Sequence, residues 1–216
     1  MDVLNTIQSV LQSIDLDTVL DITKVAVGLI YLYLEYHARR SLWIASVIMP
    51  CIGMWLFYNK GLYADFAINI YYLVIAVYGW IVWSRSSKDA SNAFVKTEAK
   101  SEVAISHVPL KMILPIVALW LCVWGLIAWI LATFTDSTVV VLDSMTTSMS
   151  IVAMWMLARK YIEQWFVWFV VDAIYVYLYW YKGIYFSGSL YAFYTGMAIV
   201  GYRKWCRLKK EADAKA

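Results

Sequence analysis

Charged side chains are scarce in this chain of 216 residues: they make up 15% of it, whereas soluble domains carry about 25%. Only three cysteines, three prolines and nine glycines are present. The cysteines are widely spaced and form no disulfide framework or metal-binding pattern, which excludes a disulfide-stapled secreted domain. The scarcity of glycine and proline excludes a collagen-like chain, and the scarcity of charge excludes a disordered one.

Hydrophobic residues, by contrast, make up 63% of the chain, and 17% of it is aromatic. A single soluble core could not bury so much apolar surface. The composition therefore predicts an integral membrane protein. The first residues lack the basic region and the cleavage site of a signal peptide, so we expect the first membrane segment to remain in the mature protein.

Seven continuous apolar runs are each long enough to cross a bilayer as a helix, which takes about 20 residues. They are Thr18–Tyr36, Ser41–Tyr58, Leu62–Trp83, Leu110–Phe134, Val139–Ala158, Gln164–Tyr181 and Tyr185–Tyr202. Membrane-spanning strands would instead appear as short segments of alternating polarity. The predicted fold class is therefore all-α, with seven transmembrane helices.

Lysine and arginine are distributed very unevenly over the segments between these runs. One side of the membrane would hold 15 of them, and the other side only 2, Lys60 and Lys182. Because basic residues are retained in the cytoplasm, this bias predicts an outer N-terminus and a cytoplasmic C-terminus in the plasma (inner) membrane. The polar stretch at 84–109 then becomes a cytoplasmic linker, and 206–216 a basic cytoplasmic tail.

The segment before the first run, residues 1–17, carries apolar side chains at helical spacing. This pattern predicts a short amphipathic helix at the N-terminus. Such a helix either lies on the outer surface of the bilayer or covers the mouth of the bundle, and the sequence leaves both interpretations open.

The chain matches itself when it is shifted by 122 residues. The aligned residues include Lys60–Tyr63 with Lys182–Tyr185, Trp43 with Trp165, Gly79 with Gly201, and Trp83 with Trp205. The match pairs a three-helix repeat at 18–83 with another at 135–205, and leaves 110–134 as a connector helix. Because the offset covers four spans, both repeats insert in the same orientation. This 3+1+3 arrangement is one of the two repeat designs of transporters, which bind their substrate between the repeats.

Motifs in both repeats resemble signatures of the PnuC vitamin transporters. Tyr78–Trp83 reads YGWIVW and is similar to the YGW-x-x-W signature of that family. The segments Leu157–Trp165 (LARKYIEQW) and Tyr181–Trp205 fit the same family. The resemblance covers nearly the whole chain apart from the linker.

This resemblance implies a fold related to the SWEET transporters, a homotrimer, and facilitated diffusion of nicotinamide riboside by alternating access. Some members of the family carry thiamine or riboflavin instead. A separate cytoplasmic kinase would trap the vitamin by phosphorylation. The implied partners are thus a small vitamin and the lipid bilayer, with no nucleic acid. The family also implies a glutamine near Met154 in riboside carriers, so the methionine raises thiamine as the alternative.

Polar residues inside the spans are the first candidates for substrate binding. Asp172 lies midway along the sixth span, where an ionisable group is costly and is a functional hypothesis by default. Nicotinamide riboside and thiamine both carry a ring cation, for which this carboxylate could serve as counter-ion; a structural hydrogen bond is the alternative. Asn69 and Tyr72 share one face of the third span, where an amide suits a carboxamide or a hydroxyl group as well as a neighbouring helix.

Met154, Trp155, Trp168 and Tyr175 complete the predicted site. Met154 follows a polar stripe in the fifth span, which packing against a neighbouring helix would also explain. Aromatic rings can stack on a flat cation, an interaction worth about 2 kcal/mol when it is desolvated, although most aromatic residues in such a chain serve packing. The tryptophans at span ends are interpreted as anchors at the membrane interface: Trp43, Trp165 and Trp205.

Motifs of other functional classes are missing from the sequence. No GxxxxGK[ST], HExxH or GxSxG pattern occurs, so we predict no ATP motor, no enzyme, no cofactor and no metal site. A retinal protein would need a lysine within the last span, which has none. A receptor would need a cytoplasmic output domain larger than this tail.

Overall fold

The computed structural model describes residues 16–59, 63–91, 104–134, 139–181, 183 and 185–214. Most of the described residues lie in seven helices: α2 (Leu16–Tyr36), α3 (Leu42–Asn59), α4 (Tyr63–Ser91), α5 (Leu110–Phe134), α6 (Val140–Ala158), α7 (Gln164–Tyr181) and α8 (Tyr185–Asp213). The predicted amphipathic helix, which falls almost entirely within residues 1–15, lies outside the described residues, as do Lys60 and Lys182.

Most helix ends lie within two residues of the ends of the apolar runs, and two helices continue well beyond them. The bounds of α5 and α7 coincide with the predicted spans, whereas α4 continues to Ser91 and α8 continues to Asp213. Both extensions are rich in polar and charged residues, several of which are good helix formers in water. An apolar run gives the length needed to cross the hydrocarbon layer, but it sets no limit on a helix that continues beyond that layer.

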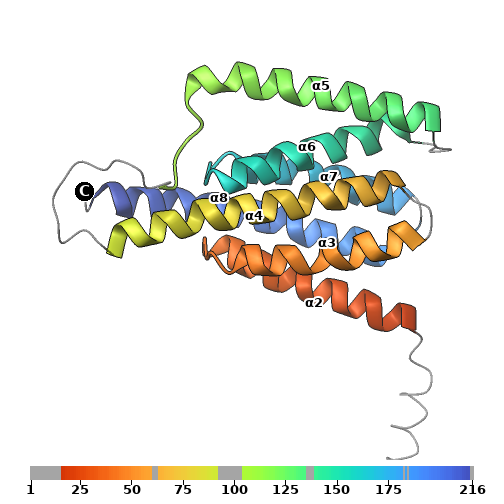
Figure 1. Cartoon of the computed structure of the whole chain (residues 1–216), viewed down its shortest axis with the longest axis horizontal. Coiled ribbons are helices and arrows are strands. Elements are labelled where there is room, and N and C mark those ends of the chain that lie inside the picture. Colours follow the sequence, from red (N-terminus) through yellow and green to blue (C-terminus); the bar gives the residue numbers. More distant parts are fainter. Residues whose placement is uncertain are drawn as a thin grey trace, which may run out of the picture.

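Six of the helices close into a ring of two triplets, and the seventh lies outside it (Figure 1). In the first triplet α3 packs between α2 and α4, and in the second triplet α7 packs between α6 and α8. The triplets meet where α4 contacts α6 and where α2 contacts α8. Helix α5 packs on α6, on the outer side of the ring.

Within the described part of the chain, three stretches are long and apolar enough to cross a membrane: Phe66–Ser84, Leu110–Phe134 and Val140–Ala158. The second of them is α5, which buries none of its residues, as expected of a helix that faces lipid. Two indole N–H groups fix it to the ring. Trp120 and Trp124 donate to the hydroxyl oxygens of Ser148 and Ser144, both at 3.1 Å.

Four tryptophans, which we call the tryptophan core, pack between the triplets near one end of the ring: Trp43, Trp83, Trp165 and Trp205. Each exposes 2% or less of its surface. The rings of Trp43 and Trp83 meet edge to face with centroids 5.6 Å apart, and those of Trp165 and Trp205 do so at 5.8 Å. The interpretation of Trp43, Trp165 and Trp205 as interface anchors is therefore wrong, because neighbouring helices bury all three.

A glycine makes room for a tryptophan in each triplet. A methyl group at Gly79 would collide with the indole of Trp43, and one at Gly201 would lie 2.6 Å from the indole of Trp165. The two glycines are 122 residues apart, and so are the two tryptophans. The same close contact therefore occurs at the same place in both triplets.

The tryptophan core also joins the triplets by two crossed hydrogen bonds. The Nε1 atom of Trp83 donates to the carbonyl oxygen of Ala158 at 3.2 Å, and that of Trp205 donates to the carbonyl oxygen of Glu35 at 3.1 Å. Each bond runs from the last helix of one triplet to the final turn of the first helix of the other. The two triplets are thus held together at this end of the ring.

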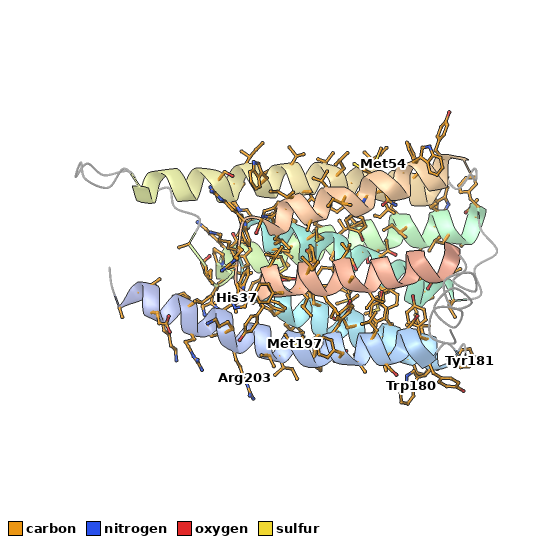
Figure 2. All side chains as sticks on the ribbon, turned by 90° about the horizontal axis from the view of Figure 1, so that it is seen from below. His37, Met54, Trp180, Tyr181, Met197 and Arg203 are labelled. Carbon is orange, nitrogen blue, oxygen red and sulfur yellow. The ribbon has the colours of Figure 1, made fainter. Side chains whose placement is uncertain are left out.

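Basic side chains gather at the same end, which we call the basic end. Figure 2 shows His37 and Arg203 there, far along the bundle from Trp180. Arg159, which follows α6, donates a hydrogen bond of 3.4 Å to the hydroxyl of Tyr78, and this bond raises the pKa of the guanidinium. The helices thus bring together basic residues that are far apart in the sequence.

The last residues of the polar stretch before α5 are fixed to the turn between α6 and α7. Ser106 makes two backbone hydrogen bonds with this turn, of 3.0 and 3.1 Å. The carboxylate of Glu163 accepts a hydrogen bond from the backbone N–H of Val108 at 2.9 Å and lies 2.7 Å from Nδ1 of His107. The predicted linker is therefore anchored at the basic end just before α5 begins.

Candidate functional site

A cavity of about 490 Å³ lies between the two triplets and is lined by all six helices of the ring. We call it the central cavity. Its volume falls within the range of small-molecule sites, which is about 300–1,000 Å³. Six of the seven predicted substrate-binding residues line it: Asn69, Tyr72, Met154, Trp168, Asp172 and Tyr175.

Asp172 is the acidic residue of the central cavity. It lies in the middle of α7 and is 8% exposed. Trp168 and Tyr175 lie four residues before it and three after it, so the three side chains share one helix face. A carboxylate in such an apolar setting is costly unless a cation or several donors meet it. The position is therefore suited to a positively charged solute.

Aromatic rings form one wall of the central cavity. The ring of Tyr191 lies 4.9 Å from that of Tyr175 and 5.3 Å from that of Tyr179, measured between centroids. Aromatic faces beside a carboxylate favour a flat cation, because the ring faces and the carboxylate both attract positive charge. Tyr191 was not predicted from the sequence, where nothing distinguished it from many other tyrosines.

One hydrogen bond connects the triplets next to the central cavity. The hydroxyl of Tyr31 in α2 lies 3.5 Å from the sulfur of Met154 in α6. Both residues line the cavity. The methionine that the sequence singled out therefore lines the central cavity, and its sulfur contacts a tyrosine from the opposite triplet.

Trp155, the seventh predicted substrate-binding residue, is not among the residues that line the central cavity. Trp155 lines a separate apolar pocket with Tyr71 and Ile116, next to α5. Successive residues of an α-helix point about 100° apart, so Met154 and Trp155 face different neighbours. The sequence motif contained both residues, but the helix directs only Met154 towards the cavity.

Hydroxyl side chains of α6 form hydrogen bonds with α5 and with the backbone of α6 itself. Ser144 and Ser148 accept the indole hydrogen bonds from α5 described above. Thr146 donates to the carbonyl oxygen of Leu142 at 3.0 Å, and Ser150 donates to that of Thr146 at 2.8 Å. The predicted stripe consists of Thr146, Thr147, Ser150 and Met154, of which Ser150 and Met154 line the central cavity.

A smaller cavity of about 220 Å³ adjoins the central cavity on the side of the basic end. We call it the inner cavity. Asp172 and Trp168 line both cavities, and the inner cavity also contains Glu35, which is 3% exposed. Glu35 was not predicted from the sequence, because it lies at the end of an apolar run beside basic residues and resembles an interface residue. Its helical spacing from Gly28 and Leu32 was the available signal.

A ring of apolar helices around a largely apolar cavity with one buried carboxylate is typical of a multi-pass membrane transporter of small organic solutes. Among the described residues, no group of three or more histidine, cysteine or acidic side chains could hold a metal ion. A family model described as "Nicotinamide mononucleotide transporter" matches residues 18–207 of the chain. The chain therefore belongs to this family, the PnuC vitamin transporters, and it is a transporter and not an enzyme.

Individual transporters of known function are also similar to this chain. The nicotinamide riboside transporter PnuC of Escherichia coli (strain K12) is 25% identical over 213 residues, which cover 88% of this chain and 85% of that one. The riboflavin/roseoflavin transporter RibM of Streptomyces davaonensis is 29% identical over 184 residues, covering 82% and 80%. A crystal structure of the vitamin B3 transporter PnuC matches with a TM-score of 0.66 at 21% identity, covering 95% of this chain and 88% of that one. This last likeness shows a common fold.

Proposed function

We propose that this protein carries nicotinamide riboside across the inner membrane by facilitated diffusion. The two triplets rock about the central cavity, so that it opens to one side of the membrane at a time. The observation that carries the proposal is the convergence of six predicted residues, Asp172 among them, on a single cavity of suitable size.

The chemistry of the central cavity fits a riboside with a cationic ring. The carboxylate of Asp172 is the counter-ion of the pyridinium, and the rings of Trp168 and Tyr175 pack against its face. Asn69, on the first triplet, provides an amide for the carboxamide or a ribose hydroxyl. The substrate would thus contact both triplets, which couples its binding to their relative motion.

Thiamine and riboflavin are the alternative substrates. Thiamine also has a cationic ring, and Met154 at the cavity favours it over the riboside. The similarity to a riboflavin/roseoflavin transporter favours riboflavin, whose ring system is neutral. Charge therefore separates the candidates, since only a cation gains from Asp172.

The proposal includes seven membrane-spanning helices in a SWEET-related 3+1+3 arrangement. The repeats are 18–83 and 135–205, the connector is 110–134, and the linker 84–109 and the tail 206–216 lie in the cytoplasm with the basic end. The identical tryptophan–glycine contacts in both triplets support the duplication. The basic side chains of the basic end support the orientation, because such residues stay in the cytoplasm.

We also propose that the protein forms a homotrimer and depends on a cytoplasmic kinase. Facilitated diffusion cannot concentrate a solute, so retention requires a reaction that removes the free vitamin. Phosphorylation adds negative charge, and the product would no longer suit a cavity built around a carboxylate.

Isothermal titration of the detergent-purified protein with nicotinamide riboside, thiamine and riboflavin, each alone, tests the substrate. We expect the riboside to bind most tightly. Tight binding of thiamine without a riboside signal would transfer the proposal to thiamine, and tight binding of riboflavin alone would remove the counter-ion role of Asp172.

Uptake into cells tests the transport mode. We expect uptake of labelled riboside to survive collapse of the proton gradient on a short timescale, because the driving force is the gradient of the vitamin itself. Immediate loss of uptake would indicate symport with protons and contradict facilitated diffusion.

A further inference from the structure

The inner cavity follows one face of each of three helices. Its lining residues on α2 are Gly28, Tyr31, Leu32 and Glu35, those on α7 are Trp165, Trp168 and Asp172, and those on α8 are Tyr191, Tyr194 and Ala198. Seven residues of helix rise about 10 Å. Because α2 and α7 run in opposite directions, Asp172 lies level with Gly28, and Glu35 lies level with Trp165. The inner cavity therefore leads from Asp172 towards the basic end and reaches Glu35 there.

Glu35 and its neighbours are buried without the partners that such groups need. Its Oε1 atom has no hydrogen-bond partner, although the carboxyl is 3% exposed and lines the cavity. The fully buried amide of Gln164 lies beside the carboxyl and offers it a donor, although neither polar atom of this amide reaches full hydrogen-bond geometry. Buried polar groups of this kind are normally satisfied, and leaving one unsatisfied costs free energy. Glu35 places such a carboxyl at the wall of the inner cavity, where a cationic solute could pair with it.

Two tryptophans that line the same cavity also have buried indole N–H groups. The Nε1 atoms of Trp165 and Trp168 are buried and have no hydrogen-bond partner. The cavity thus combines the carboxyl groups of Glu35 and Asp172 with the aromatic side chains of Trp165 and Trp168. A carboxylate at each end of a small apolar cavity repels the other, and a cation between them removes this cost.

We propose that the inner cavity is a second subsite, which takes the cationic ring of the solute after it leaves the central cavity. This inference rests on the proposed function. At about 220 Å³ the subsite is smaller than the usual range for small-molecule sites and suits a single heteroaromatic ring. The ring passes from Asp172 to Glu35, while the remainder of the solute still occupies the central cavity. Glu35 thereby keeps the positive charge paired as it approaches the basic end.

The test uses a ring cation without its sugar, 1-methylnicotinamide, and its neutral counterpart, nicotinamide. Both are titrated against the detergent-purified wild-type protein and against Glu35→Gln. We expect Glu35→Gln to weaken binding of 1-methylnicotinamide at least tenfold and to leave the weaker binding of nicotinamide unchanged. Unchanged binding of the ring cation would overturn the second subsite. This assay needs no vitamin, so it tests the second subsite independently of the proposed function. If none of the three vitamins bound, that result would contradict the proposed function but not the second subsite.

Exchange across proteoliposomes then separates a subsite on the route from a part of the central site. We expect Glu35→Gln to slow riboside exchange at least tenfold while changing the dissociation constant of the whole riboside less than threefold. An equal loss of riboside affinity would place Glu35 in the main site and overturn the proposal. A third outcome is that Glu35→Gln leaves exchange without a proton gradient at the wild-type rate and changes only the uptake driven by such a gradient. Glu35 would then carry a proton, and this result would also overturn the second subsite.

Glu163→Gln is the matched control, because Glu163 lies at the same end but is partly exposed and contacts His107. It removes the same charge from the same region, so we expect wild-type binding and exchange. Size-exclusion profiles and melting temperatures establish that both variants are folded. If Glu35→Gln did not fold, Glu35→Asp, which shortens the side chain and keeps its charge, is expected to retain 1-methylnicotinamide binding within threefold.

Discussion

The tryptophan core and the central cavity lie between the same two triplets, but the internal repeat is kept in the core and lost at the cavity. Positions 122 residues apart hold the same residue in the core, as Trp43 and Trp165 do. Corresponding positions at the cavity differ: Pro50 matches Asp172, and Asn69 matches Tyr191. In the core, equivalent helices pack in the same way in both triplets, so the same side-chain shapes are needed in each. A solute with a charged ring at one end and a sugar at the other needs different groups on its two sides.

The largest effect is expected from tryptophans one turn apart on α7. Trp165→Ala should lower the free energy of unfolding by about 3–5 kcal/mol, because a fully buried ring leaves an unfilled space. Trp168→Ala should cost much less stability and should instead weaken riboside binding. Thermal unfolding and titration of both variants measure the two effects. Equal losses of stability would contradict the separation of core and cavity.

The next largest effect concerns the charge of the cavity. Asp172→Asn should weaken binding of a cationic vitamin roughly 100-fold, because the buried cation loses its counter-charge. Riboflavin, which is neutral, should lose less than threefold. Titration calorimetry measures both, with Asp213→Asn as the control on an exposed carboxylate that pairs with Lys209 at 2.6 Å. Unchanged affinity for the cation would refute the counter-ion role.

A smaller effect should follow from adding one methyl group to the core. Gly201→Ala places a Cβ against the indole of Trp165, and such overpacking costs about 1–3 kcal/mol. Gly196→Ala on the same helix meets nothing within 4 Å, so only the gain in helix propensity remains, about 1 kcal/mol. The melting temperature should fall for the first variant and stay level or rise for the second. A fall of similar size in both would show that the clash is not the cause.

The smallest effect tests the equivalence of the triplets. Trp83→Phe and Trp205→Phe each remove one crossed hydrogen bond to a backbone carbonyl, a loss of about 1 kcal/mol. We expect the two variants to lose equal stability in thermal unfolding. A loss that is more than twice as large on one side would show that the two bonds are not equivalent.

The sequence predicted most of the helices because crossing a bilayer imposes a length and a polarity that are visible in one dimension. Six of the residues proposed from the sequence line the central cavity. Asp172 and Asn69 were visible among them because a charge or an amide is rarely tolerated within a span without a role. The extensions of α4 and α8 were not predicted, because the prediction relied on the limits that the bilayer sets on length and polarity. Beyond the hydrocarbon layer no such constraint acts, and polar residues form a helix or a loop equally well.

Burial inside the bundle was harder to predict than position along it. Trp43 and Trp165 lie at span ends, where tryptophans usually meet the membrane interface, and only the facing helices show that they are buried. Gly79, which contacts Trp43, and Gly201, which contacts Trp165, were the available signal of this burial. A glycine inside a helix often marks the close approach of another side chain. The place of Trp155 outside the central cavity could not be predicted, because the sequence does not show which side of α6 meets α5.

The crossed indole bonds have a consequence for the origin of the chain. A half-length protein could form the same two bonds with a second copy of itself, and it would be a symmetric homodimer. Every cavity residue of that homodimer would then occur twice, so an aspartate at the position of Asp172 would face a second carboxylate. Like charges repel in a dry site. Fusion of the two copies into one chain removes this restriction, because one copy can keep the carboxylate while the other carries Pro50 at the matching position.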